Sequence, residues 1–147
     1  MDKYYEKYVE LNLLNDMVFK FFFGQEMTKD NAEYLVNTIL EFNNASLKGS
    51  LHIVGNKAIT LPIFAGKTLK FDVIGFNDHE VVDIEVENRK KGNYLWRIEA
   101  YGSAIHLENF KKGETYENFK TTITISILNY NLVKDGEFFE YQTTTFG

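Results

Sequence analysis

The 147-residue sequence has no cysteine, a single proline and no apolar stretch close to the ~20 residues that a membrane span requires. Without cysteine, disulfide scaffolds, iron–sulfur clusters, cysteine-ligated zinc and thiol nucleophiles are excluded, and a reducing compartment is favoured. The first residues, MDKYYEKYVEL, mix acids, bases and tyrosines and lack the apolar core of a signal peptide. The sequence therefore predicts a cytoplasmic protein without a membrane segment.

Common catalytic signatures are absent as well. The sequence contains no Walker loop, no GxGxxG and no GxSxG, which argues against nucleotide-dependent enzymes and α/β hydrolases. Its histidines show no HxH or HxxxH spacing, so we expect them to be structural or exposed; they are His52, His79 and His106. A histidine-based catalytic or metal site is therefore not predicted.

Positive charge is also scarce, with 16 Lys and Arg against 21 Asp and Glu and a net charge of −5. This balance argues against a general nucleic-acid binder, because phosphate affinity comes mostly from basic side chains. The acids are clustered: within ten residues that contain no Lys or Arg lie Asp78, Glu80, Asp83, Glu85 and Glu87. Such a run is either a solvated face or a functional site.

Apolar periodicity predicts one domain that mixes helices and strands. Trp96, Ala100 and Ala104 recur every four residues, which predicts a long helix with Trp96 in the core. Isoleucines alternate with Thr and Ser in the strand that follows, and a strand–helix–strand crossover should make that strand parallel to a neighbour. The expected order is helices 16–23 and 28–43, strands 51–63, 69–74 and 81–87, helix 94–110, and strands 121–131 and 138–141.

The second and third of these strands place several carboxylates on one face. Side chains alternate along a strand, so Asp83, Glu85 and Glu87 point the same way. A turn at Asn77-Asp78 would pair Asp72 with Asp83, which adds a fourth acid to the row, and would place Glu80 away from the row, opposite Gly75. Carboxylates this close call for a cation, and hard oxygen ligands favour Mg²⁺ or Mn²⁺. A register slip of one residue would remove Asp72 from the row.

Three stretches of the sequence resemble the PD-(D/E)XK nuclease superfamily, and within it the recombination-promoting nucleases, or PD-(D/E)XK family putative transposases. LNDMVFKFFFGQEMTKDNAEYLVNTIL is similar to the opening "nDxxFKxxFG" motif and the helix after it. KFDVIGFNDHEVVDIEVEN resembles the "DV…IEIQ" hairpin, and WRIEAYGSAIHLENFKKGETYENFKTTITISIL resembles the "R…Y…GexY…vixIxIL" helix and strand. The resemblance spans about residues 11–130. It implies an α/β (α+β), restriction-endonuclease-like fold with a mixed sheet flanked by helices.

The activity implied by this resemblance is metal-dependent hydrolysis of DNA phosphodiesters by the endonuclease domain of a transposase-like protein. Asp72 and Glu85 match the motif acids that ligate the metal, and the carboxylate row adds Asp83 as a third ligand. Glu87 stands where the motif places a catalytic Lys, which is often Gln in this group. A Glu at this position is similar to the variant found in some active restriction enzymes of the superfamily. Arg97 and Tyr101 match the "R…Y" positions and are expected to contact phosphate.

Three hypotheses for the function remain open. The first is an active nuclease that uses Asp72, Glu85 and Glu87, with Lys70 as a candidate substitute for the motif Lys. The second is a non-catalytic remnant that keeps the fold for DNA or protein binding. The third is an acidic interaction module without metal. The surface is nearly neutral outside the carboxylate row, so DNA affinity is expected to be modest unless a partner or a second copy adds positive charge. Residues 1–147 are expected to form one domain, and a C-terminal part of a longer protein is expected to be missing.

Overall fold

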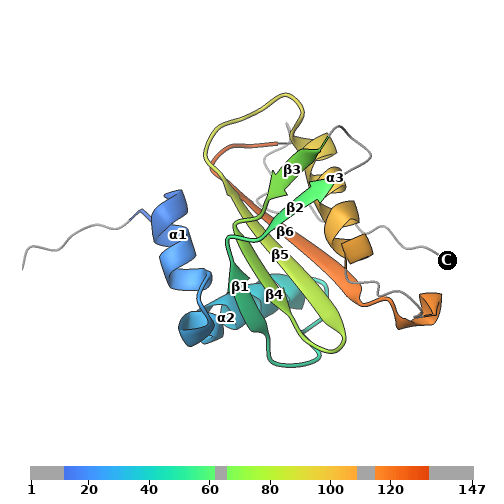
Figure 1. Cartoon of the computed structure of the whole chain (residues 1–147). Coiled ribbons are helices and arrows are strands. Elements are labelled where there is room, and N and C mark those ends of the chain that lie inside the picture. The colour runs from blue at the N-terminus through green and yellow to red at the C-terminus, as the bar shows by residue number, and fades with distance from the viewer. Residues whose placement is uncertain (1–11, 62–65, 109–114, 133–147) are drawn as a thin grey trace, which may run out of the picture.

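The computed structural model describes residues 12–61, 66–108 and 115–132 (Figure 1). Along the chain lie α1 (Asp16–Phe23), α2 (Lys29–Glu41), β1 (His52–Gly55), β2 (Ala58–Leu61), β3 (Lys67–Lys70), β4 (Val73–Phe76), β5 (Glu80–Glu87), α3 (Tyr94–Glu108) and β6 (Thr121–Leu128). A 3₁₀ turn at Glu26–Thr28 leads into α2, and another at Tyr116–Asn118 precedes β6. In the parts of the chain that the structure describes, no helix is long and apolar enough to cross a membrane.

Four strands form the main sheet in the order β1-β4-β5-β6, and β2 and β3 form a separate two-stranded ladder. β5 is antiparallel to β4 and parallel to β6, so the sheet is mixed. One face packs on α2 and the other on α3, with the small ladder beside α3 (Figure 1). The predicted mixed sheet flanked by helices, and the parallel pairing after the crossover helix, are confirmed.

The expected strands are divided more finely than the sequence suggests. The predicted strand 51–63 is β1 and β2, which are separated at Asn56, where φ is 55°. The predicted strand 69–74 is likewise β3 and β4, with Phe71 and Asp72 between them. The predicted last strand, 138–141, lies outside the described residues.

The hairpin of β4 and β5 turns one residue later than expected. The amide of Asn77 donates to the carbonyl of Glu80 (3.0 Å), and the Asn77 side chain accepts from the amides of His79 and Glu80. The two turn residues are therefore Asp78 and His79, and Ile74 lies opposite Asp83. A shift of two positions in the pairing keeps every side chain on its predicted face.

Glu80 lies away from the carboxylate row, as predicted, but in different surroundings. It is only 3% exposed, and its Oε2 accepts from the amide of Lys48 (2.9 Å) and from Nδ2 of Asn77 (3.0 Å). The side chain is buried because it serves as a hydrogen-bond acceptor for both the loop before β1 and the hairpin turn. The predicted pairing of Glu80 with Gly75 is wrong.

Trp96 was expected in the core but is 75% exposed. The residues of α3 that turn inward are Tyr94, Ala104 and Ile105. Both sides of α3 carry apolar residues, so spacing alone could not decide which stripe is buried. Arg97 faces the carboxylates of β5. Because successive residues of a helix point about 100° apart, the neighbouring Trp96 does not share this face, and its side chain points toward solvent.

Candidate active site

The Glu85 side chain binds the backbone of Asp72, and the Asp72 side chain binds the backbone of Val86, the residue after Glu85. The amide of Asp72 donates to Glu85 Oε1 (3.1 Å), and the amide of Val86 donates to Asp72 Oδ2 (3.1 Å). Asp72 sits in the short break between β3 and β4, one residue beyond the pair of Val73 with Ile84. The structure thus brings the two predicted metal-binding carboxylates together, on the face of the sheet that α3 covers.

Burial strongly raises the pKa of two acids of β5, Asp83 and Glu85. Asp83 is 0% exposed, and neither of its carboxylate oxygens has a hydrogen-bond partner. Burial raises the pKa of Asp83 to about 9, and the negative charge of Glu85 acts in the same direction. Burial also raises the pKa of Glu85 to about 7, with the charge of Asp72 adding to it. Without a cation, these carboxyl groups therefore hold protons well above the usual carboxylate range.

Arg97 joins Glu85 and Glu87. Its Nη1 lies 2.7 Å from Glu87 Oε2, and its Nη2 lies 3.5 Å from Glu85 Oε2. Lys91 Nζ adds a contact of 3.3 Å to Glu87 Oε2. Burial opposes ionisation of Glu87, but Lys91 and Arg97 outweigh it and hold the pKa of Glu87 below its ordinary value. Glu87 is therefore an ionised, paired carboxylate.

The Tyr101 ring packs against the guanidinium group of Arg97. The guanidinium carbon lies 5.3 Å from the centre of the Tyr101 ring, and that ring lies 4.8 Å from the ring of Phe71. This stacking restricts the plane of the guanidinium group. The predicted pair of Arg97 and Tyr101 thus shares one face of α3, beside the carboxylates.

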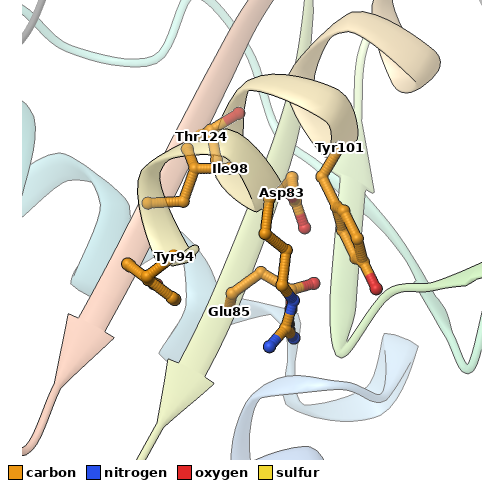
Figure 2. A pocket seen from close by; sticks show the side chains of 7 residues that line it. Asp83, Glu85, Tyr94, Ile98, Tyr101 and Thr124 are labelled. Carbon is orange, nitrogen blue, oxygen red and sulfur yellow. Dashed lines mark ion pairs between the residues drawn. The ribbon is translucent and has the colours of Figure 1, made fainter. Parts of the chain in front are cut away.

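A small cavity opens between β5 and α3 at these residues (Figure 2). It holds about 10 Å³, which is room for one water molecule or one ion. Asp83 and Glu85 reach it from the strand, and Tyr94, Ile98 and Tyr101 surround them (Figure 2). The unpartnered Asp83 oxygens are thus next to a space that a cation or a water could fill.

Lys20 is a site residue that the sequence interpretation missed. Its Nζ lies 3.3 Å from Asp72 Oδ1 and 3.3 Å from Asp16 Oδ1. Lys20 stands at the Lys of the "nDxxFKxxFG" stretch, and its spacing from Asp16 on one helix could have indicated their contact, but nothing in that stretch indicates the contact with Asp72. Lys70, the expected substitute for the motif Lys, is exposed at the end of β3, opposite Ala58. The ion pairs among the described residues include none from Lys70 to these acids.

The donor set suits a hard divalent cation, although no group of three or more His, Asp or Glu side chains within the described ranges is placed to hold one. Mg²⁺ is usually bound by one or two carboxylates together with water and substrate phosphate. Asp72 and Glu85 supply two such carboxylates, and the unpartnered oxygens of Asp83 lie beside them. The residues present therefore fit a Mg²⁺ or Mn²⁺ ion.

Comparison with protein families matches residues 13–144 to the PD-(D/E)XK nuclease family transposases. The chain belongs to this family. The matched region runs from just before α1 to beyond β6 and includes every acid of the site. Comparisons with curated proteins and with solved structures each gave no match. The chain is therefore a nuclease-like transposase domain, for which the family implies DNA as substrate.

Proposed function

We propose that this chain is a metal-dependent DNA endonuclease that hydrolyses phosphodiester bonds as part of a transposase-like, recombination-promoting protein. The observation that supports this function best is the pair of hydrogen bonds that holds the partly buried Asp72 carboxylate and the buried Glu85 carboxylate near one another, from the Asp72 amide to Glu85 and from the Val86 amide to Asp72. Their raised pKa values indicate a site that is strained by its own negative charge until a cation neutralises it.

The oxygens of Asp72 and Glu85 would hold Mg²⁺ or Mn²⁺, and Asp83 would become a further ligand only if its side chain moved toward them, because no three acids of the described residues are placed around one ion. When bound, such an ion lowers the pKa of a water molecule and neutralises charge that develops on the phosphate oxygens. The protein's own contribution is the fixed position of the two carboxylates, because each accepts a backbone hydrogen bond from the other's strand. The proposed cleavage is hydrolysis, in which water attacks phosphorus and one P–O bond breaks.

Arg97 would bind a phosphate of the DNA beside the cleavage point. A guanidinium group has five N–H donors, and the contacts to Glu85 and Glu87 leave some of them for a phosphate oxygen. The Tyr101 ring supports the group from below. Lys70, which is exposed at the end of β3, is proposed as a more distant contact to the DNA backbone.

Glu87 cannot supply the positive charge of the motif Lys. It would take part in catalysis indirectly, by holding Arg97 in place. Its carboxylate is held between Arg97 and Lys91, at 2.7 and 3.3 Å. The side chain therefore positions the guanidinium group over the site. The same pairing also supports a second candidate function, in which a domain without the motif Lys binds DNA but cleaves it weakly or not at all.

The test is nicking of a supercoiled plasmid by the purified protein with Mg²⁺, Mn²⁺ or EDTA. We expect cleavage with either ion and none with EDTA. Asp72→Asn and Glu85→Gln should each reduce the rate at least ~100-fold while the circular dichroism spectrum stays native. Two exposed acids give matched controls, Asp78→Asn in the same hairpin and Glu99→Gln on α3.

Residual cleavage within about tenfold of wild type in either site variant would contradict the roles assigned to Asp72 and Glu85. If the wild-type protein bound DNA but did not cleave it with either ion, the binding remnant would be the better description. Size-exclusion chromatography of the same preparations would show whether the chain forms a dimer, in which a second copy could add positive charge for DNA binding.

A further inference from the structure

The site lacks the ammonium group that the superfamily's motif places at position 87, where this chain has Glu. Position 87 carries Glu, and that carboxylate is already neutralised by Arg97 and Lys91. Resting on the proposed nuclease function, we propose that Lys20 of α1 supplies this missing positive charge and positions the scissile phosphate and attacking water beside Asp72. The charge thus comes from a different element, on the opposite side of Asp72.

The contact of Lys20 is with the oxygen of Asp72 that remains available. Asp72 Oδ2 accepts the amide of Val86, whereas Oδ1 is 3.3 Å from Lys20 Nζ. A cation bound to Asp72 would approach the same Oδ1, because that oxygen has no backbone partner among the described hydrogen bonds. The ammonium group of Lys20 therefore lies beside the oxygen of Asp72 that would bind the ion.

A second partner keeps Lys20 near the site when Asp72 is occupied. Asp16, one helical turn earlier, lies 3.3 Å from the same ammonium group. Asp16 is mostly exposed, with 67% of its side chain accessible, whereas Lys20 has 29% accessible. Lys20 can therefore leave Asp72 for a phosphate oxygen while Asp16 still restrains it. This gives Lys20 the geometry of a positioning residue.

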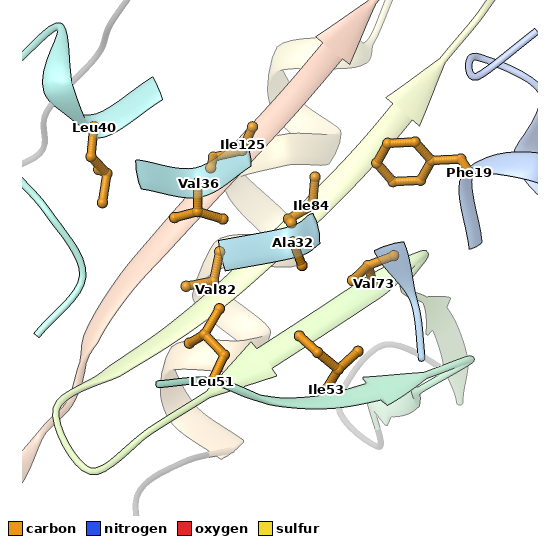
Figure 3. Packing of buried hydrophobic residues seen from close by; sticks show 10 residues of the cluster. All are labelled: Phe19, Ala32, Val36, Leu40, Leu51, Ile53, Val73, Val82, Ile84 and Ile125. Atoms are coloured by element: carbon orange, nitrogen blue, oxygen red, sulfur yellow. The ribbon is translucent and has the colours of Figure 1, made fainter. Parts of the chain in front are cut away.

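The placement of Lys20 is fixed by the packing of α1. Phe19, which is 2% exposed, reaches from α1 into the core beside Val73 and Ile84 (Figure 3). At the end of the helix, Gly24 lies so close to β1 that a Cβ atom added at Gly55 would be 2.7 Å from its carbonyl oxygen. The helix is thus anchored at both positions that flank Lys20.

The other cations near the site have different partners. Arg97 contacts Glu85 and Glu87, and Lys91 contacts Glu87. Within the described parts of the chain, Lys20 is the basic residue that forms an ion pair with Asp72. Its side chain is therefore the available source of a positive charge at that carboxylate.

The test compares Lys20→Met and Lys20→Arg with the wild type in two assays. The first is plasmid cleavage with Mn²⁺, where Lys20→Met should lower kcat by ~100-fold and Lys20→Arg should recover to within about tenfold of wild type. Lys48→Met is the matched control, because Lys48 is exposed at the other end of β5 and its described contact is through its backbone amide.

The second assay is the Mn²⁺-induced rise in melting temperature without DNA. Lys20 and the ion both approach Asp72 Oδ1, so Lys20→Met should leave this rise unchanged or enlarge it. A side chain that only supported the fold would, when removed, weaken both cleavage and metal binding. The expected combination of slower cleavage with undiminished metal binding therefore separates a positioning role from a structural one.

The two proposals fail in different ways. If wild-type protein does not cleave, the nuclease function is overturned and the role of Lys20 with it. If the wild type cleaves and Lys20→Met cleaves within about threefold of it, the role of Lys20 alone is overturned. A smaller Mn²⁺-induced rise in Lys20→Met, or a Lys20→Arg variant as slow as Lys20→Met, would also overturn the role of Lys20.

Discussion

Nη1 of Arg97 on α3 lies 2.7 Å from Oε2 of Glu87 at the end of β5. The ion pair ties the helix to the strand at the edge of the carboxylate cluster, and Lys91 adds a second cation to the same oxygen. A position that usually carries a positive or neutral side chain has thus become the anchor of an arginine. The local charge balance around the site follows from this substitution.

Restoring the motif lysine is therefore expected to destabilise the protein. Glu87→Lys removes the partner of Arg97 and places a third positive charge beside Arg97 and Lys91. We expect a loss of ~1–3 kcal/mol in the free energy of unfolding and a decrease of roughly 3–10 °C in melting temperature. Glu87→Gln keeps an acceptor for Arg97 and should lose less.

Thermal melts followed by circular dichroism give the comparison. Glu99→Lys makes the same charge change at an exposed position of α3 and should change the melting temperature little. A Glu87→Lys protein that melted at the wild-type temperature would show that the Arg97 contact does not support the fold.

Arg97 is predicted to contact phosphate without reading sequence. Arg97→Ala should weaken binding to unrelated duplexes by similar factors, because phosphate contacts carry no base information. The slope of log affinity against log salt should decrease by roughly one unit. Fluorescence anisotropy in EDTA over about 0.05 to 0.3 M NaCl measures this slope, with Lys48→Ala as the control. If the slope did not change, Arg97 would be a structural partner of Glu85 and Glu87 only.

The buried acids are expected to make the metal-free protein less stable at alkaline pH. In the folded chain the pKa of Asp83 is about 9 and that of Glu85 about 7, whereas unfolded carboxyl groups titrate near ~4. Between these values the folded chain holds more protons than the unfolded chain, so the free energy of unfolding falls as the pH rises.

Asp83→Asn should remove much of this pH dependence, because the amide is neutral and can donate to Glu85. In EDTA at about pH 8 the variant should melt above the wild type, by ~2–4 °C for each kcal/mol recovered, and the difference should shrink toward about pH 4. Asp78→Asn, an exposed acid of the same hairpin, is the control. A variant that melted below the wild type at about pH 8 would contradict the pKa assignments.

Trp96 is expected to be dispensable for the fold. Its side chain is 75% exposed, so Trp96→Ala should change the free energy of unfolding by less than ~0.5 kcal/mol. Because it is the sole tryptophan, its fluorescence in the native protein should be quenched readily by iodide. A loss above ~2 kcal/mol, or protection from iodide, would return Trp96 to the core that its spacing suggested.

The features that the sequence predicted correctly are those that depend on short-range patterns. The predicted helix 16–23 is α1, and it starts where Asn15 accepts from the amides of Met17 and Val18, which is a local capping interaction. The predicted alternation of side chains along β5 is correct although the predicted hairpin turn is not. The pairing with β4 differs from the prediction by two positions, which leaves Asp72 on the same face as Asp83 and Glu85.

The errors and omissions concern contacts between distant segments. Glu80 is buried because Lys48 and Asn77 both donate to it, and the first of these contacts spans 32 positions in the sequence. The pair of Lys20 with Asp72 joins α1 to the residue before β4, and the "nDxxFKxxFG" stretch that contains Lys20 does not reveal this partner. Trp96 was misplaced because α3 carries apolar residues on both sides, and the partners of Arg97 decide which side turns inward.

The central claim is that Asp72 and Glu85 together hold a divalent cation, and a Mn²⁺ titration followed by electron paramagnetic resonance of the free ion tests it most directly. The account predicts saturable binding by the wild type and by Asp78→Asn, and at least tenfold weaker binding by Asp72→Asn and Glu85→Gln. A free Mn²⁺ concentration of ~100 times the dissociation constant should also add roughly 2.7 kcal/mol to the free energy of unfolding of the wild type. No binding at millimolar Mn²⁺, or equal binding by all four proteins, would contradict the account.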